Sequence, residues 1–163
     1  MILLLVCSSM AHGRIGETLE ECRKRYDKET ETKNGAVLFT KAEVWVVVVF
    51  WKDKVHRIGF MVASDEGKGK ALSVVQRDAL LEANRPSDGK GNKVKWERSW
   101  DGLDALHARW RTVDKSMCAE YADNALIVIT KKFKDHLVIL EEAKKKKNAT
   151  EKATKEKEAL KDF

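Results

Sequence analysis

Cysteine and proline are scarce in this chain, which has three cysteines and a single proline among 163 residues. No Cys-x-x-Cys pair occurs, so the sequence gives no support for a zinc site or for thioredoxin-like redox chemistry. The Gly-x-Ser-x-Gly, His-Glu-x-x-His and dinucleotide-binding glycine patterns are also missing. No catalytic residue, metal or cofactor is therefore assigned. The four histidines are scattered without the spacing of a ligand set: His12, His56, His107 and His136.

The charge balance is basic, with 32 Lys and Arg against 26 Asp and Glu and a formal net charge of +6. Much of the charge excess lies in residues 141–163. A basic surface can bind anionic partners but does not identify one. At 163 residues the chain is expected to form one domain, over residues 12–133, with room for a hydrophobic core.

The N-terminal residues 1–11 are apolar, then small, and carry no charged side chain. Ser9 and Ala11 stand where signal peptidase reads small residues, which predicts cleavage before His12 and a periplasmic or secreted protein. The segment is too short to span a bilayer as a helix. It is also short for a signal peptide and lacks a basic leader, so we expect the start codon to lie upstream. The alternative is a buried N-terminal strand.

Cleavage would leave two cysteines, Cys22 and Cys118, in an oxidising compartment. A disulfide between them could form and would close a long loop. The alternative is that each is a small buried apolar residue, Cys22 on a helix and Cys118 in a strand. The sequence does not give their separation, so it leaves both open.

The run Val44–Val62 is rich in β-branched and aromatic residues on both sides of a charged break at residues 52–54, which predicts a β-hairpin. Both faces of its first strand are apolar. We therefore expect one face to pack on helices and the other to be at least partly covered. Alternation along the return strand predicts that His56, Ile58, Phe60 and Val62 share one face, and Val55, Arg57, Gly59 and Met61 the other.

Two helix starts carry the same signature. Thr18 with Glu21, and Ser73 with Gln76, form capping-box patterns ahead of apolar residues. Strands are predicted after each helix, at residues 36–40 and in the hairpin, then at 94–100, 109–113, 117–122 and 126–133. The order of helix, three strands, helix, and three or four strands predicts an α+β fold in which two similar halves form one antiparallel sheet.

Residues 134–163 form a charged tail. Asp135 can cap a helix that carries Leu137 and Leu140, and Glu and Lys then recur at four-residue spacing. This pattern predicts a long, solvated C-terminal helix, at the end of which Leu160 and Phe163 could dock on a partner. The alternative is a frayed charged tail.

Aromatic and basic residues alternate between positions 96 and 111. Such interleaving can bind single-stranded nucleic acid or carbohydrate. It also arises when tryptophans pack inward from a strand and arginines face water. Export would remove most nucleic-acid partners. The candidate partner-binding residues are Trp96, Arg98, Trp100, Arg109 and Arg111, together with Leu160 and Phe163.

Five parts of the chain carry short motifs: Arg14–Thr18, Glu21–Tyr26, Leu80–Asn84, the pattern from Trp110 to Thr130, and the charged tail. Together these motifs resemble small exported proteins of Verrucomicrobia and related bacteria, although the usual Tyr-Gly after the first helix is Tyr-Asp here. This resemblance implies a compartment and no activity. A charged hairpin turn at residues 51–55 after a Gly-x-Thr helix start is distantly similar to the outer-membrane assembly lipoprotein BamE and to β-lactamase-inhibitor-protein-like domains, and implies an α+β fold. The lipid-attachment motif of BamE is missing.

Together these patterns favour an exported, non-catalytic protein that binds another macromolecule, a protein or polymer of the cell envelope, without a membrane span. One alternative is an envelope-associated hydrolase, which would need polar groups converging near His56 or His107. The other is a nucleic-acid-binding protein, if the chain is cytosolic. The sequence leaves the oligomeric state open.

Overall fold

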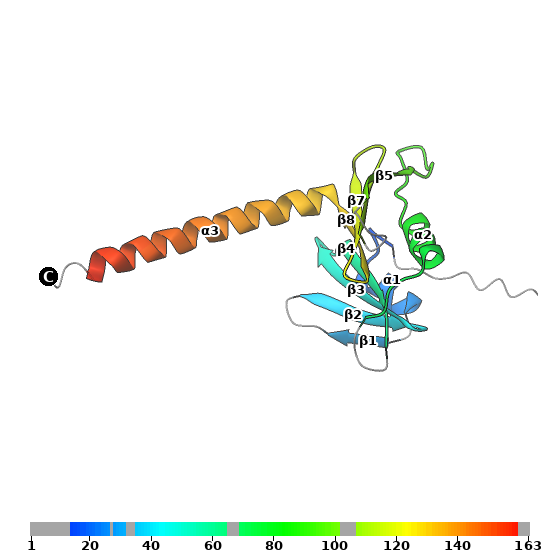
Figure 1. The fold of residues 1–163 in the computed structure, drawn as a ribbon, viewed down its shortest axis with the longest axis horizontal. Coiled ribbons are helices and arrows are strands. Elements are labelled where there is room, and N and C mark those ends of the chain that lie inside the picture. Colours follow the sequence, from blue (N-terminus) through cyan, green and yellow to red (C-terminus); the bar gives the residue numbers. More distant parts are fainter. Residues whose placement is uncertain (1–13, 27, 32–34, 65–68, 102–106, 160–163) are drawn as a thin grey trace, which may run out of the picture.

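The computed structural model describes residues 14–26, 28–31, 35–64, 69–101 and 107–159, which form three helices and an eight-stranded antiparallel sheet (Figure 1). The strand order across the sheet is β1-β2-β3-β4-β8-β7-β6-β5. The helices are α1 (Leu19–Arg25), α2 (Val74–Ala83) and α3 (Lys131–Ala159). The strands are β1 (Lys28–Glu31), β2 (Ala36–Lys41), β3 (Val44–Trp51), β4 (Lys54–Val62), β5 (Trp96–Asp101), β6 (Ala108–Thr112), β7 (Met117–Ala122) and β8 (Ala125–Thr130).

The sheet is built from two halves, in each of which a short helix precedes four strands. The last strands of the two halves, β4 and β8, pair at the centre of the sheet, with Gly59 opposite Ile127. Both short helices start at the predicted capping boxes, where the Thr18 and Ser73 side chains accept a hydrogen bond from the backbone N–H three residues on. The predicted α+β class and antiparallel sheet are confirmed.

The first half has four strands rather than the predicted three. The additional strand, β1, has the sequence Lys-Glu-Thr-Glu, which lacks the apolar alternation that marks a half-buried strand. It lies at the edge of the sheet, with Glu29 opposite Phe39 of β2. Polar side chains suit an edge strand because they stay solvated and discourage pairing with other chains.

The predicted strand over residues 126–133 is too long by three residues. The strand ends at Thr130 and α3 begins at Lys131, earlier than the predicted cap at Asp135. The Thr130 hydroxyl accepts a hydrogen bond from the backbone N–H of Phe133 (3.3 Å) and so serves as the cap. The sequence did not predict this cap, because Thr130 ends an apolar run that is typical of a strand.

One face of the sheet, here called the inner face, carries the core. Val48 lies opposite Ile58, and Ile58 opposite Val128, and all three are fully buried. The residue that ends α1, Tyr26, stacks on Phe39 of this face with ring centroids 4.8 Å apart. Both short helices therefore cover the same face. They contribute Cys22, Leu80 and Leu81 to its core.

A β-bulge changes the side-chain faces predicted for β4. Arg57 pairs with Val49 but Val55 pairs with Phe50, so His56 is an extra residue on β4. Val55 is therefore fully buried with the core instead of sharing a face with Arg57. The prediction of strict alternation was wrong here because a bulge inserts one residue without changing the composition of the strand.

The long helix α3 extends away from the sheet, on the side opposite to α2 (Figure 1). Its charged surface includes pairs at four-residue spacing, such as Lys145 with Glu141 (2.8 Å). Residues 141–152 are exposed. Among the described residues, no helix is both long enough and apolar enough to cross a membrane.

Candidate interaction surface

The face of the sheet opposite to α1 and α2, here called the outer face, is apolar at its centre. Strand register places Val47 between Leu38 and Gly59, and Gly59 opposite Ile127. The side chains of Leu38, Val47 and Ile127 are only partly buried, in contrast to the core residues of the inner face. We call five residues of this face the outer patch: Leu38, Val47, Val49, Ile127 and Ile129.

Gly59 leaves a low point in the outer patch, because no side chain stands between Val47 and Ile127 on this row. A Cβ added at Gly59 would meet only the Ile127 side chain and the Val47 carbonyl oxygen, both at 3.9 Å. The position could therefore hold a larger residue. Its lack of a side chain is not required by packing within the described residues.

A cluster of aromatic rings attaches α3 at the end of the outer face. The His136 ring of α3 stacks on Trp51 of β3 (centroids 5.0 Å), and Phe133 lies 5.9 Å from the same ring. The His56 ring meets Trp51 edge-on at 5.0 Å, and its Nδ1 lies 2.8 Å from the Thr130 hydroxyl oxygen. These contacts fix the first turns of α3 against the sheet at one end of the outer patch.

The surroundings of His56 in this cluster favour its neutral form. Burial is the main cause that lowers the pKa of His56 below 6.5, and the positive charges of Lys132 and Lys52 lower it further. The Lys52 ammonium also lies 4.8 Å from the centroid of the Trp51 ring. Positive charge thus surrounds the point where α3 leaves the sheet.

The turn of α3 that follows the aromatic cluster is apolar on all sides. Leu137, Val138, Ile139 and Leu140 are 40%, 50%, 63% and 51% exposed. Four consecutive residues cover the full circumference of a helix, and helices that are apolar all round are normally buried. This turn therefore lacks cover within the described parts of the chain.

Basic side chains border the outer patch and are not neutralised within the described residues. Arg57 lies half-buried between Val49 and Ile129, and no carboxylate pairs with it there. Lys134 of α3 is close enough to Cys118 of β7 to act on its titration. Two nearby carboxylates are already in ion pairs, Glu120 with Arg109 (2.7 Å) and Asp135 with Lys131 (2.5 Å).

The tryptophans and arginines predicted to bind a partner divide between the two faces of the sheet. Trp96 donates a hydrogen bond from its indole N–H to the Leu81 carbonyl oxygen of α2 (2.7 Å) and is half-buried. Arg98 lies over the ring of Trp110, which is 8% exposed. Trp96 and Trp110 pack on the core side, as the packing interpretation expects, and Arg98 lies on that same side with its side chain exposed.

The remaining predicted residues face outward. Trp100 is 48% exposed, with the Arg109 guanidinium 5.2 Å from its ring centroid. Register places Arg111 beside Cys118 and Glu97 on the outer face. The structure thus brings Trp100, Arg109 and Arg111 to the same face as the outer patch. The predicted signal peptide (residues 1–11) and the predicted docking residues Leu160 and Phe163 lie outside the described residues.

The two cysteines of the predicted mature chain are free and do not form the proposed disulfide. Cys22 belongs to the inner-face core, whereas Cys118 lies opposite Ile129 on the outer face, so the sheet separates them. Burial, with the carboxylate of Glu17 as the next cause, raises the pKa of the Cys22 thiol to about 12. Cys22 is thus an inert packing residue, as the alternative prediction had it.

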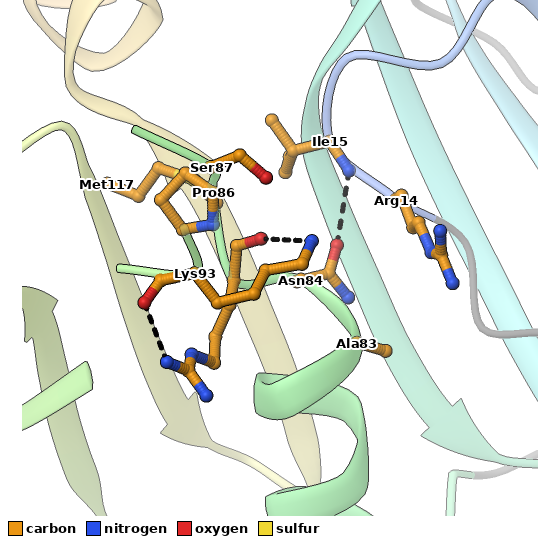
Figure 2. A pocket seen from close by; sticks show the side chains of 9 residues that line it. Arg14, Ile15, Ala83, Asn84, Pro86, Ser87, Lys93 and Met117 are labelled. Atoms are coloured by element: carbon orange, nitrogen blue, oxygen red, sulfur yellow. Dashed lines mark hydrogen bonds between the residues drawn. The ribbon is translucent and has the colours of Figure 1, made fainter. Parts of the chain in front are cut away.

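A small cavity of about 160 Å³ lies beside the end of α2 (Figure 2). The Asn84 side-chain oxygen accepts a hydrogen bond from the Ile15 backbone N–H (3.2 Å), and its amide nitrogen donates to the Leu80 carbonyl oxygen (2.9 Å). Lys93 donates to the Arg85 carbonyl oxygen (3.2 Å). These polar groups bond to one another and hold the N-terminal segment against α2. We therefore assign the cavity to packing between these segments and not to ligand binding.

Neither similarity to known proteins nor the chemistry of the described residues points to a catalytic site. No protein-family model, curated protein or solved structure matches this chain. Among the residues that the structure describes, no three His, Cys, Asp or Glu side chains are grouped to hold a metal ion. The outer patch combines uncovered apolar side chains with unpaired basic side chains at its border, and packing within the described residues explains neither.

Sequence reasoning found part of this surface. Both faces of residues 44–51 are apolar, which singled out the second face of the hairpin and predicted that it is at least partly covered. The contribution of Ile127 and Ile129, and the placement of α3 beside them, depended on the pairing of β4 with β8. That pairing joins the two halves and has no local signal in the sequence.

Proposed function

We propose that this protein is an exported, non-catalytic protein that binds another macromolecule in the cell envelope through the outer patch. The observation that carries the proposal is an apolar sheet face that α1 and α2 leave open, while both helices cover the opposite face. Exposed contiguous apolar surface on a soluble domain marks interaction sites. Export rests on the apolar residues 1–11 and their small residues before His12.

The edges of the sheet support binding across the face rather than by strand addition. β1 is short and charged, and β5 carries an irregularity between Arg98 and Trp100. Charged side chains and bulges at edge strands both oppose pairing with a further strand. A partner would therefore contact side chains of the outer face.

Site-specific photo-crosslinking tests the binding surface. A benzoylphenylalanine at Val47, on the outer face, should give one adduct of defined mass when the protein is expressed in its native cells. The matched control position is Val75 on α2, which is 79% exposed but lies on the other side of the sheet. Adducts at both positions, or at neither, would contradict the proposal.

N-terminal sequencing of the protein recovered from the envelope fraction tests export. A mature chain that begins at His12 is the expected result. An intact Met1 in the cytosolic fraction would contradict export and would reopen the nucleic-acid alternative.

A further inference from the structure

The outer patch and the first turns of α3 meet in a corner whose two walls are both apolar. Phe133 and His136 hold α3 against Trp51 at the end of the patch. Leu137 lies four residues after Phe133, on the same side of the helix, and is 40% exposed. The exposed apolar turn and the outer patch are therefore adjacent parts of one surface, which we call the α3 corner.

The α3 corner carries both signs of charge, but its acids Glu120 and Asp135 are already in ion pairs with Arg109 and Lys131. The charges left unpaired beside Ile129 and on the first turn of α3 are basic. Arg57 lies within the apolar rows, and Lys132 and Lys134 project from the first turn of α3, with their charges acting on His56 and Cys118. The described chain pairs none of these three cations with a carboxylate. The nearby acid Asp53 lies with Thr18, Leu19 and Glu20 on the α1 side.

We propose that the α3 corner binds an amphipathic helical segment of a partner protein, with apolar side chains on the outer patch and Asp or Glu side chains toward Arg57, Lys132 and Lys134. This inference rests on the proposed function and names the chemistry of the partner. An unpaired cation beside apolar surface forms its strongest ion pair with an acidic side chain that is itself flanked by apolar side chains. Binding of such a segment excludes water from around the pair, which strengthens the attraction.

The dimensions of the patch suit a helix. From Leu38 on β2 to Ile127 on β8 the patch spans three strand spacings, roughly 14 Å. A helix with its side chains is about 10–12 Å across, so one helix covers most of this width. The low point at Gly59 would receive a side chain of the bound helix between Val47 and Ile127.

Fluorescence anisotropy with defined peptides tests the inference on the full chain. The probe is a labelled helical peptide of about 18 residues with Leu on one face and Glu on the other. Its matched control carries Lys in place of Glu. We expect the Leu/Glu peptide to bind at least about tenfold more tightly than the Leu/Lys peptide, with an affinity that falls as salt rises.

Three protein variants locate the site. Arg57→Glu should weaken binding of the Leu/Glu peptide by about tenfold or more. Gly59→Val should also weaken it by filling the low point, and a Cβ there meets nothing closer than 3.9 Å. Lys24→Glu makes the same charge change on exposed α1, across the sheet, and should leave affinity within about twofold. Circular dichroism melts confirm that each variant is folded.

Each of the following outcomes would overturn the inference. Equal affinity for both peptides would show that the basic side chains do not select acidic partners. Unchanged affinity of Arg57→Glu or Gly59→Val for the Leu/Glu peptide would place the binding site elsewhere. Binding to phosphatidylglycerol vesicles but not to the peptide would assign the corner to a membrane surface. Dimerisation of the chain through position 47, without peptide binding, would assign it to a second copy. If the peptide fails while the native adduct at Val47 persists, the inference falls and the proposed function stands.

Discussion

Replacing Glu17 with glutamine tests how far a buried ion pair stabilises the N-terminal half of this protein. The Glu17 carboxylate forms a two-point pair with the Arg25 guanidinium, including a hydrogen bond from Nε to Oε2 of 3.2 Å. Side-chain exposure is 11% for Glu17 and 24% for Arg25. The Glu17 carbonyl oxygen also accepts a hydrogen bond from the Val55 backbone N–H (2.8 Å), which fixes the segment on β4.

The expected cost follows from this burial. Removing one partner of a fully buried pair costs about 3–5 kcal/mol, because the other charge stays buried and unpaired. Arg25 keeps a quarter of its exposure and glutamine can still accept one hydrogen bond, so we expect about 2 kcal/mol for Glu17→Gln. For a chain of this size that lowers the melting temperature by about 4–8 °C.

Urea denaturation and calorimetry near neutral pH measure this effect, and the chain offers a matched control. Glu29→Gln breaks the Arg23–Glu29 pair, in which the side chains are 53% and 29% exposed, and should leave the melting temperature nearly unchanged. Adding Arg25→Met to Glu17→Gln should recover part of the lost stability, because it removes the unpaired charge. Equal effects of Glu17→Gln and Glu29→Gln would refute the reasoning, as would a double variant less stable than Glu17→Gln.

Three further predictions concern the cap of α2, the cysteines and the aromatic cluster. Ser73→Ala removes the hydroxyl that accepts the Gln76 backbone N–H, and should cost about 1 kcal/mol in the urea-derived free energy of unfolding; no change would show that the cap is dispensable. Because the pKa of Cys22 is raised to about 12, a thiol reagent followed by peptide mass spectrometry should label it only as fast as the protein unfolds, whereas half-buried Cys118 should react earlier. The folded-state pKa of His56 is lowered from 6.5, so in acid the unfolded chain binds more protons than the folded chain, and the free energy of unfolding should fall as the pH drops below about 7. That fall should be smaller in His56→Gln, and an equal slope in both proteins would count against the assignment.

Patterns that depend on neighbours in the chain were predicted correctly from the sequence. Both capping boxes form, because a Ser or Thr and the residue three positions on are brought together by the first helical turn itself. The hairpin over β3 and β4 was predicted for the same reason, since two β-branched runs flank a short charged turn. Composition and spacing were sufficient to predict the α+β class.

Features that need a second segment were missed. Strand β1 has no strand signal of its own and exists because β2 offers a free edge. The bulge at His56 and the earlier start of α3 at Lys131 both depend on how Trp51, Phe133 and Thr130 come together at the end of the sheet. No local sequence pattern predicts that these three residues come together.

For the candidate site, too, some features follow from the sequence and others only from the tertiary structure. The sequence by itself determined that the first hairpin strand is apolar on both faces, that tryptophans and arginines alternate near β5 and β6, and that a charged helix follows the last strand. Only the tertiary structure decided that α1 and α2 share one face, which leaves the other open. The pairing of β4 with β8 then completes the outer patch and brings Arg57 beside Ile129. The physical reason is that side-chain alternation fixes which residues of one strand share a face, whereas the neighbours of that face are set by pairing between strands distant in the chain.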